Sequence, residues 1–205
     1  PEIGSLPPLP QPPEETVVPR GPERQPRTLR IALVGEVRGE IEPCGCPTLP
    51  YGGFERREAL LSRLAEGGVP VFHLDAGELL LKGRTTTRGR DPARRATLLL
   101  DLSADVGVQA WAPGPSDVLV LGAVGLDELA DGTRSGPLAL SATLRRPDGS
   151  APLPPSTILD SGGVRLGVIG LTPQVQGRDL REVLSIDPVA VSVQKALDAL
   201  PDDLD

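Results

Sequence analysis

Several residue types are scarce or missing in this chain of 205 residues. It has no asparagine and one histidine, His73, so a metal site with several histidine ligands or an asparagine ligand cannot be built from its own residues. Aromatic residues make up only 2%, which leaves Leu, Val, Ala and Ile to form the core. No run approaches the roughly 18 consecutive apolar residues that a membrane-spanning helix needs.

Positive charge is also in deficit, since 21 Lys and Arg face 28 Asp and Glu and the net charge is −7. Nucleic acid phosphates repel such a protein, so a nucleic-acid partner is disfavoured. The one strongly basic stretch covers residues 82–95. We interpret it as a solvated loop, with binding of an anion or of an acidic partner surface as the alternative.

The first 29 residues contain nine prolines and almost no periodic apolar pattern. Such a segment favours extended polyproline II structure without a packed core. We therefore divide the chain into a Pro-rich extended arm, residues 1–29, and a folded domain, residues 30–205. The arm could be a spacer, a tether from a membrane anchor upstream, or a ligand for a groove that recognises proline. Because the chain begins at Pro1 without Met, we expect that a targeting segment preceded it.

From residue 29 onward the apolar pattern predicts alternating strands and helices. A strand over 29–34, a helix over 54–66 and a strand over 69–74 form a βαβ unit, whose two strands should be parallel. We then predict a helix over 92–104, a strand over 106–111, a turn over 112–117, a short helix over 124–130 and a strand over 138–143. A hairpin follows over 155–171 around Gly162-Gly163, and Asp187-Pro188 opens a last helix that runs to about residue 200.

Six segments stand in an order that is typical of a known family. They are IALVGEVRGEIEP, YGGFERREALLSRL, VFHLDAGELL, VQAWAPGPSDVLVLGAVGLDEL, LALSATLRRPDG and STILDSGGVRLGVIGLTP. Together they resemble the N-terminal part of calcineurin-like metallophosphoesterases, in the secreted 5′-nucleotidase branch. The resemblance implies an α/β fold: part of an αββα metallophosphoesterase-like sandwich with a mixed sheet.

The same resemblance implies a site with two metal ions, which activate water to attack a phosphate ester. At the matching positions the first Asp is Glu36, its partner His is Arg38, the second Asp is Glu78, the bridging Asn is Pro115 and the next His is Ser116. Proline offers no side-chain ligand. A fixed guanidinium where a dication should sit opposes metal binding by Coulomb repulsion.

The remaining polar groups suggest an altered site. Glu36 and Glu78 follow adjacent predicted strands, so we hypothesise a Glu36–Arg38–Glu78 cluster in which one guanidinium replaces the metals. Asp75 ends its strand where open α/β folds place their sites, and it could bind a cation, pair with Arg38 or cap a loop. His73 shares a strand face with Asp75 and is interpreted as a partly buried structural histidine.

Cys44 and Cys46 are separated by one glycine, in a Pro-Cys-Gly-Cys loop that resembles an insertion in some secreted relatives of the branch. Three interpretations are open. The pair could form a small disulfide in an exported protein, bind a soft metal such as copper or zinc, or remain as free thiols.

These features predict a non-catalytic, extracytoplasmic domain, in the periplasm or on the cell surface and with a lipid anchor upstream. It would serve as an accessory or interaction module for a protein partner and would need no cofactor. The first alternative is a metal-dependent phosphoesterase of the 5′-nucleotidase type that uses Glu36, Asp75 and Glu78. The second is a domain that binds a thiophilic metal through Cys44 and Cys46.

Overall fold

The structure is a computed structural model, and it describes residues 28–43, 45, 48, 51–80, 92–174 and 184–205. Most of the proline-rich arm, Cys44, Cys46 and most of the basic stretch lie outside the described residues. The hypotheses that concern those three features therefore stay predictions, and so does the division of the chain at residue 29. Among the described residues, no helix combines the length and the apolar character needed to cross a membrane.

The centre of the fold is a four-stranded sheet in the order β1-β2-β3-β4, in which every neighbouring pair is parallel. The strands are β1 (Arg30–Val34), β2 (Val71–Asp75), β3 (Ala110–Trp111) and β4 (Leu138–Ala139). Helix α1 (Phe54–Leu64) lies between β1 and β2 in the sequence, so the predicted βαβ unit is confirmed.

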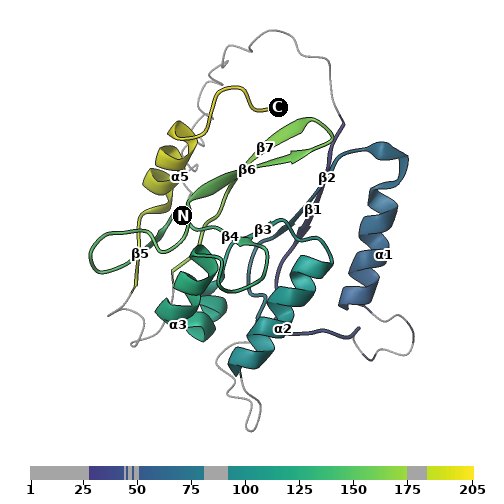
Figure 1. Cartoon of the computed structure of the whole chain (residues 1–205), viewed down its shortest axis with the longest axis horizontal. Coiled ribbons are helices and arrows are strands. Elements are labelled where there is room, and N and C mark those ends of the chain that lie inside the picture. Colours follow the sequence, from purple (N-terminus) through teal and green to yellow (C-terminus); the bar gives the residue numbers. More distant parts are fainter. Residues whose placement is uncertain (1–27, 44, 46–47, 49–50, 81–91, 175–183) are drawn as a thin grey trace, which may run out of the picture.

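Three helices cover one face of this sheet, which Figure 1 shows beside β1 to β4. Helix α1 begins after Gly52 and Gly53, whose φ angles of 75° and 86° favour glycine. Helix α2 (Pro92–Asp105) starts with proline, whose missing N–H costs nothing in the first turn. Its buried residues are spaced for one helical face and are Ala96, Leu99, Leu100 and Ser103.

The third helix, α3 (Pro115–Ala130), corrects the sequence prediction of a turn over 112–117 and a short helix over 124–130. Proline at the first position and Asp117 in the first turn start the helix earlier than its apolar pattern indicates. Gly122 then has φ 59° and ψ −170°, which kinks the helix and interrupts that pattern. The kink explains why only the second half was recognisable from its periodicity.

Two predicted strands are also shorter than expected. The strand predicted over 106–111 is confined to β3, because the N–H groups of Val106 and Gly107 are still bonded to the last turn of α2. The strand predicted over 138–143 is replaced by two short pieces, β4 and β5 (Leu144–Arg145). Strand β5 pairs antiparallel with β8 (Ser185–Ile186).

The hairpin prediction is confirmed, since β6 (Ser156–Ser161) and β7 (Val164–Ile169) pair antiparallel. Gly162 and Gly163 have φ angles of 58° and 75°, as a two-residue turn with both central residues left-handed requires. Parallel and antiparallel pairings therefore both occur, but they lie in separate sheets and not in one mixed sheet.

The elements stack in four layers. Helices α1 to α3 lie on one face of the parallel sheet, β6 contacts β2 on the other face, and α5 (Val189–Asp198) packs against β7 (Figure 1). The chain after β4 touches the chain after β7 at Gly170, where a Cβ atom would lie 2.3 Å from the carbonyl oxygen of Leu140. The structure is thus α/β with part of an αββα sandwich.

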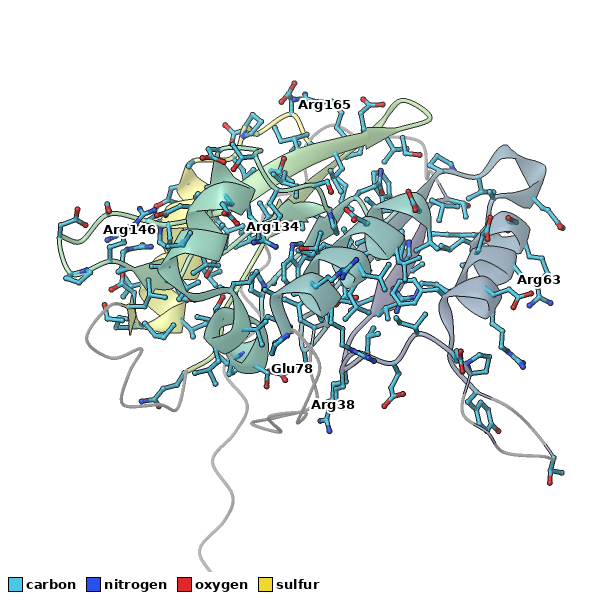
Figure 2. The ribbon with its side chains drawn as sticks, turned by 60° about the horizontal axis from the view of Figure 1, so that its bottom comes forward. Arg38, Arg63, Glu78, Arg134, Arg146 and Arg165 are labelled. Carbon is cyan, nitrogen blue, oxygen red and sulfur yellow. The ribbon has the colours of Figure 1, made fainter. Side chains whose placement is uncertain are left out.

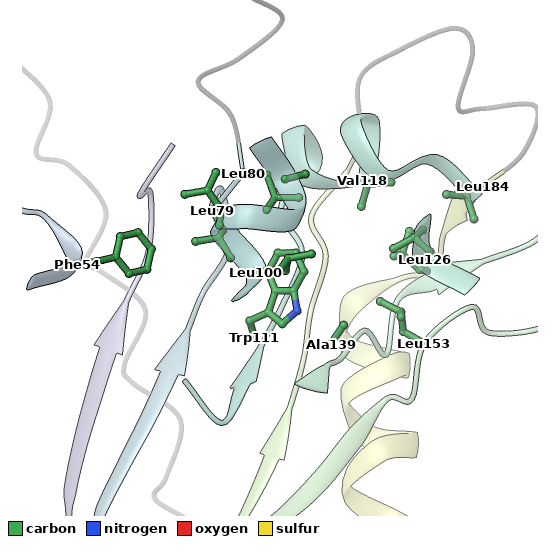
Figure 3. Packing of buried hydrophobic residues seen from close by; sticks show 13 residues of the cluster. Phe54, Leu79, Leu80, Leu100, Trp111, Val118, Leu126, Ala139, Leu153 and Leu184 are labelled. Carbon is green, nitrogen blue, oxygen red and sulfur yellow. The ribbon is translucent and has the colours of Figure 1, made fainter. Parts of the chain in front are cut away.

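The main core fills the space between the sheet and the helices (Figure 3). Trp111 lies in it among leucines, and the cluster is otherwise almost entirely aliphatic, as the scarcity of aromatic residues predicts. Strand β1, at the edge of the sheet, is less covered. Its side chains Ile31 and Leu33 remain 50% and 67% exposed on the face opposite the helices.

Candidate functional site

The candidate site lies at the carboxyl ends of β1 and β2, where open α/β folds place their ligands. The loops that follow the two strands are joined by backbone hydrogen bonds. The Glu36 N–H donates to the Gly77 carbonyl at 2.9 Å, and the Arg38 N–H donates to the Glu78 carbonyl at 2.7 Å. These bonds fix the positions from which Glu36, Arg38 and Glu78 project.

The backbone at these residues is unusual. Glu36, Arg38 and Glu78 have φ angles of 56°, 52° and 55°, and among the described residues they are the non-glycine positions with positive φ. A left-handed conformation costs an L-residue about 1–2 kcal/mol, and such strain gathers at functional sites. The same three positions are those at which the resemblance to metallophosphoesterases implies metal ligands.

The side chains at these positions form two separate contacts. Arg38 Nη2 lies 3.0 Å from Glu36 Oε1, in an ion pair whose side chains are 43% and 70% exposed. Glu78 Oε1 instead accepts a hydrogen bond of 3.0 Å from the backbone N–H of Ser116, at the start of α3. Figure 2 shows Arg38 and Glu78 at the same edge of the molecule. The hypothesised three-residue cluster is therefore divided, with Glu36 on Arg38 and Glu78 on α3.

Sequence reasoning missed Asp117, which is fully buried beside Glu78. Its carboxylate accepts hydrogen bonds from the backbone N–H groups of Leu79, Leu80 and Gly114 at 3.2, 2.7 and 2.8 Å. Burial raises the pKa of Asp117 to about 6, although these three bonds oppose the rise. The signal was present in the sequence, because an acidic residue two positions after Pro115 is typical of a first helical turn.

Asp75 is also buried, and the structure places Arg57, rather than Arg38, beside it. Asp75 Oδ1 accepts the Gly77 N–H at 2.9 Å, and Oδ2 lies 3.9 Å from Arg57 Nη1. Arg57 comes from α1 and lies over the ring of Phe54, 4.8 Å from its centroid. Burial raises the pKa of Asp75 and lowers that of Arg57. The expectation that Asp75 orients Arg38 is thus corrected.

His73 lies on the same face of β2 as Asp75 and is buried. Its Nδ1 is 3.3 Å from the carbonyl oxygen of Val106, and its backbone N–H donates to Gln109 Oε1 at 3.0 Å. Burial, followed by the charge of Arg57, lowers the pKa of His73. These contacts give the ring a structural environment between β2 and the end of α2.

A pocket of about 520 Å³ opens beside Glu36, between the loop after β1 and the start of α1. Its volume is within the range of small-molecule sites, about 300–1,000 Å³. The polar side chains that line it are Glu36, Glu40, Glu42, Tyr51 and Arg57.

The residues at this edge do not fit a two-metal centre. In the part of the chain that the structure describes, no group of three or more His, Cys, Asp and Glu side chains could hold a metal ion. Glu36 is paired with a guanidinium, Glu78 is bonded to a helix start, and Pro115 has no ligand atom in its side chain. Cys44 and Cys46 lie outside the described residues, so the proposed soft-metal site and disulfide remain untested.

The structure has the fold of calcineurin-like phosphoesterases and 5′-nucleotidases. The 5′-nucleotidase precursor of Thermus thermophilus matches with a TM-score of 0.61 and 23% identity over 83% of this chain. YfkN, a calcineurin-like phosphoesterase of Bacillus subtilis, matches with a TM-score of 0.65 and 15% identity over 83%. The sulfate thiohydrolase SoxB of Thermus thermophilus matches with a TM-score of 0.66 and 17% identity over 86%.

These matches concern the fold. No family model and no curated protein sequence matches the chain. The aligned part covers 34%, 57% and 42% of the three solved chains, so this chain spans between about a third and three fifths of their length.

Proposed function

We propose that this chain is a non-catalytic, extracytoplasmic domain with a metallophosphoesterase fold, which serves as an accessory or interaction module for a protein partner. The Arg38–Glu36 ion pair is the observation that carries the proposal. The pair puts a permanent cation at a position where the resemblance implies a metal ligand.

The electrostatics support this interpretation. Arginine stays protonated at every physiological pH, so its charge cannot be removed to admit a dication. Two like charges 4 Å apart repel by about 4 kcal/mol even at an effective dielectric constant near 20. Glu36 would also have to leave its partner before it could bind a metal.

The location and the partner rest on other features. A protein of the same fold is a 5′-nucleotidase precursor, which supports export, and the proline-rich arm suits a tether. The exposed apolar side chains Ile31 and Leu33 support a role in binding another polypeptide.

Metal analysis and a phosphoesterase assay test the proposal directly. Purified protein should contain less than one first-row metal ion per chain, and added Mn²⁺, Zn²⁺ or Mg²⁺ should give no hydrolysis of a nucleotide or an aryl phosphate above buffer. Two bound ions per chain, together with hydrolysis that Asp75→Ala abolishes, would overturn it.

A phosphoesterase is the second candidate, and the 520 Å³ pocket beside Glu36 favours it. In that case Glu36, Asp75 and Glu78 would supply the carboxylates, and the assay above identifies it. Thiophilic metal binding by Cys44 and Cys46 has its own test. Copper or zinc retained by the native chain should be lost in Cys44→Ser and Cys46→Ser variants.

A further inference from the structure

We propose that Glu78 and Asp117 form a reciprocal carboxylate clamp, which fastens the turn after β2 to the start of α3. The clamp stabilises this edge of the molecule as a bound metal would. The inference deepens the proposed function, because it explains how the site stays in place without metal. The clamp is made of two segments, the turn 77–80 and the helix start 114–117.

The clamp is reciprocal because each segment gives a carboxylate to the other. Glu78, in the turn, accepts the Ser116 N–H of the helix at 3.0 Å. Asp117, in the helix, accepts the N–H groups of Leu79 and Leu80 in the turn at 3.2 and 2.7 Å. Three hydrogen bonds therefore cross between the segments in both directions, and all three have a charged acceptor, which makes them stronger than neutral ones.

The backbones of the two segments lie in contact, which leaves no room for a side chain at either glycine. A Cβ atom at Gly77 would lie 2.4 Å from the carbonyl oxygen of Ala112 and 2.7 Å from the Gly114 nitrogen. A Cβ atom at Gly114 would lie 2.7 Å from Glu78 Oε1. Only glycine allows this approach, so Gly77 and Gly114 set the distance across which the carboxylates reach.

Donors of the chain itself face each carboxylate, although the nearby charge of Glu78 also contributes to the raised pKa of Asp117. Asp117 is fully buried, and both of its oxygens accept N–H groups, one of them the Gly114 N–H at the start of α3. Glu78 also faces that end, where the helix dipole favours negative charge. At the neighbouring loop Glu36 has Arg38. Glu36, Glu78 and Asp117 therefore each already face a donor of the chain itself.

The test uses thermal unfolding of the full chain, with EDTA, with 1 mM Mn²⁺ and without additions. The variants are Glu78→Ala, Asp117→Asn and the double variant, with Glu58→Ala on the exposed face of α1 as the control. For a chain of this length a loss of 1 kcal/mol lowers the Tm by about 2–4 °C. We expect Glu78→Ala to lower the Tm by about 2–4 °C, Asp117→Asn by about 4–8 °C, and the double variant by clearly less than the two shifts added together.

Neither EDTA nor Mn²⁺ should move the Tm of the native chain or of Glu78→Ala by more than about 1 °C. Amide hydrogen exchange of the native chain and Glu78→Ala keeps the test decisive if Asp117→Asn fails to fold. The Ser116 and Leu80 amides should exchange at least tenfold faster in Glu78→Ala, while amides in β6 and β7 keep their rates.

Additive Tm shifts, or unchanged Ser116 and Leu80 exchange in Glu78→Ala, would overturn the clamp. A Tm that Mn²⁺ raises or EDTA lowers by several degrees in the native chain but not in Glu78→Ala would show that a metal holds this edge, and would also overturn it. An inactive protein with such a metal-dependent Tm would leave the proposed function standing. Phosphoesterase activity in a chain with an intact clamp would overturn the proposed function and leave the clamp standing.

Discussion

At the scale of single residues, burial shifts the pKa values of the polar groups that lie beneath the helices. Burial raises the pKa of Asp75 and lowers the pKa values of His73 and Arg57, because it disfavours the charged form of each group. His73 is the informative member, because it is the only histidine of the chain and its ring can be observed by itself.

The pKa of His73 should be measured from its ring-proton chemical shift by NMR, and the midpoint should fall below the ordinary value of 6.5. Since the unfolded state then binds the proton more readily, the stability contributed by the neutral ring is present above about pH 6.5 and is lost as the pH falls through the lower, folded-state pKa. The free energy of unfolding of His73→Phe should depend less steeply on pH in that window. A midpoint at or above 6.5 would contradict the assignment.

At the scale of secondary-structure elements, the contact between α1 and β2 depends on one pair of opposite charges. Arg57 of α1 and Asp75 of β2 approach to 3.9 Å, and the Asp75 side chain has no exposed surface. Charged groups in such a place are costly when one partner is removed, because the other is left buried without compensation.

We therefore expect Arg57→Ala to lower the free energy of unfolding by about 3 kcal/mol, since Asp75 keeps its bond to the Gly77 N–H but loses its cation. Arg56→Ala is the matched control, because Arg56 is adjacent but exposed, and its effect should stay within about 0.5 kcal/mol. Urea unfolding monitored through Trp111 measures both. Equal effects of the two variants would show that the ion pair does not join the elements.

At the scale of the whole molecule, the layers depend on a close approach between the parallel sheet and the hairpin. The chain after β7 passes Leu140 at Gly170, where there is no space for a side chain. The contact is between backbones, so a larger residue cannot be accommodated by turning a flexible side chain aside.

Gly170→Ala should destabilise the protein by about 1–3 kcal/mol, the usual cost of overpacking a filled interior. The added Cβ would lie 2.3 Å from the Leu140 oxygen and 2.5 Å from its carbonyl carbon, so the layers would have to separate. Gly45→Ala provides the comparison, because a Cβ at Gly45 meets nothing within 4 Å. Thermal unfolding of the two variants checks the prediction, and a Gly170→Ala protein as stable as Gly45→Ala would refute it.

The sequence predicted most of this architecture but less of the site. The βαβ unit and the hairpin follow from local signals, namely apolar runs and the Gly-Gly turns. Contacts within one loop, such as Arg38 on Glu36, were also within reach because the two residues are neighbours. The pairing of Asp75 with Arg57 could not be predicted from the sequence, since it depends on how α1 is oriented against the sheet. Asp117 was missed because Gly122 interrupts the apolar pattern of α3, so its first turn was predicted as a loop.

The exposed border of the sheet has a practical consequence for handling the protein. Within the described residues, strand β1 presents one unpaired backbone edge, together with the half-exposed Ile31 and Leu33. Such an edge is a template on which further strands can add, and native proteins usually block it with charge or proline. We therefore expect concentrated samples to associate along β1, and we expect Leu33→Lys to reduce this association.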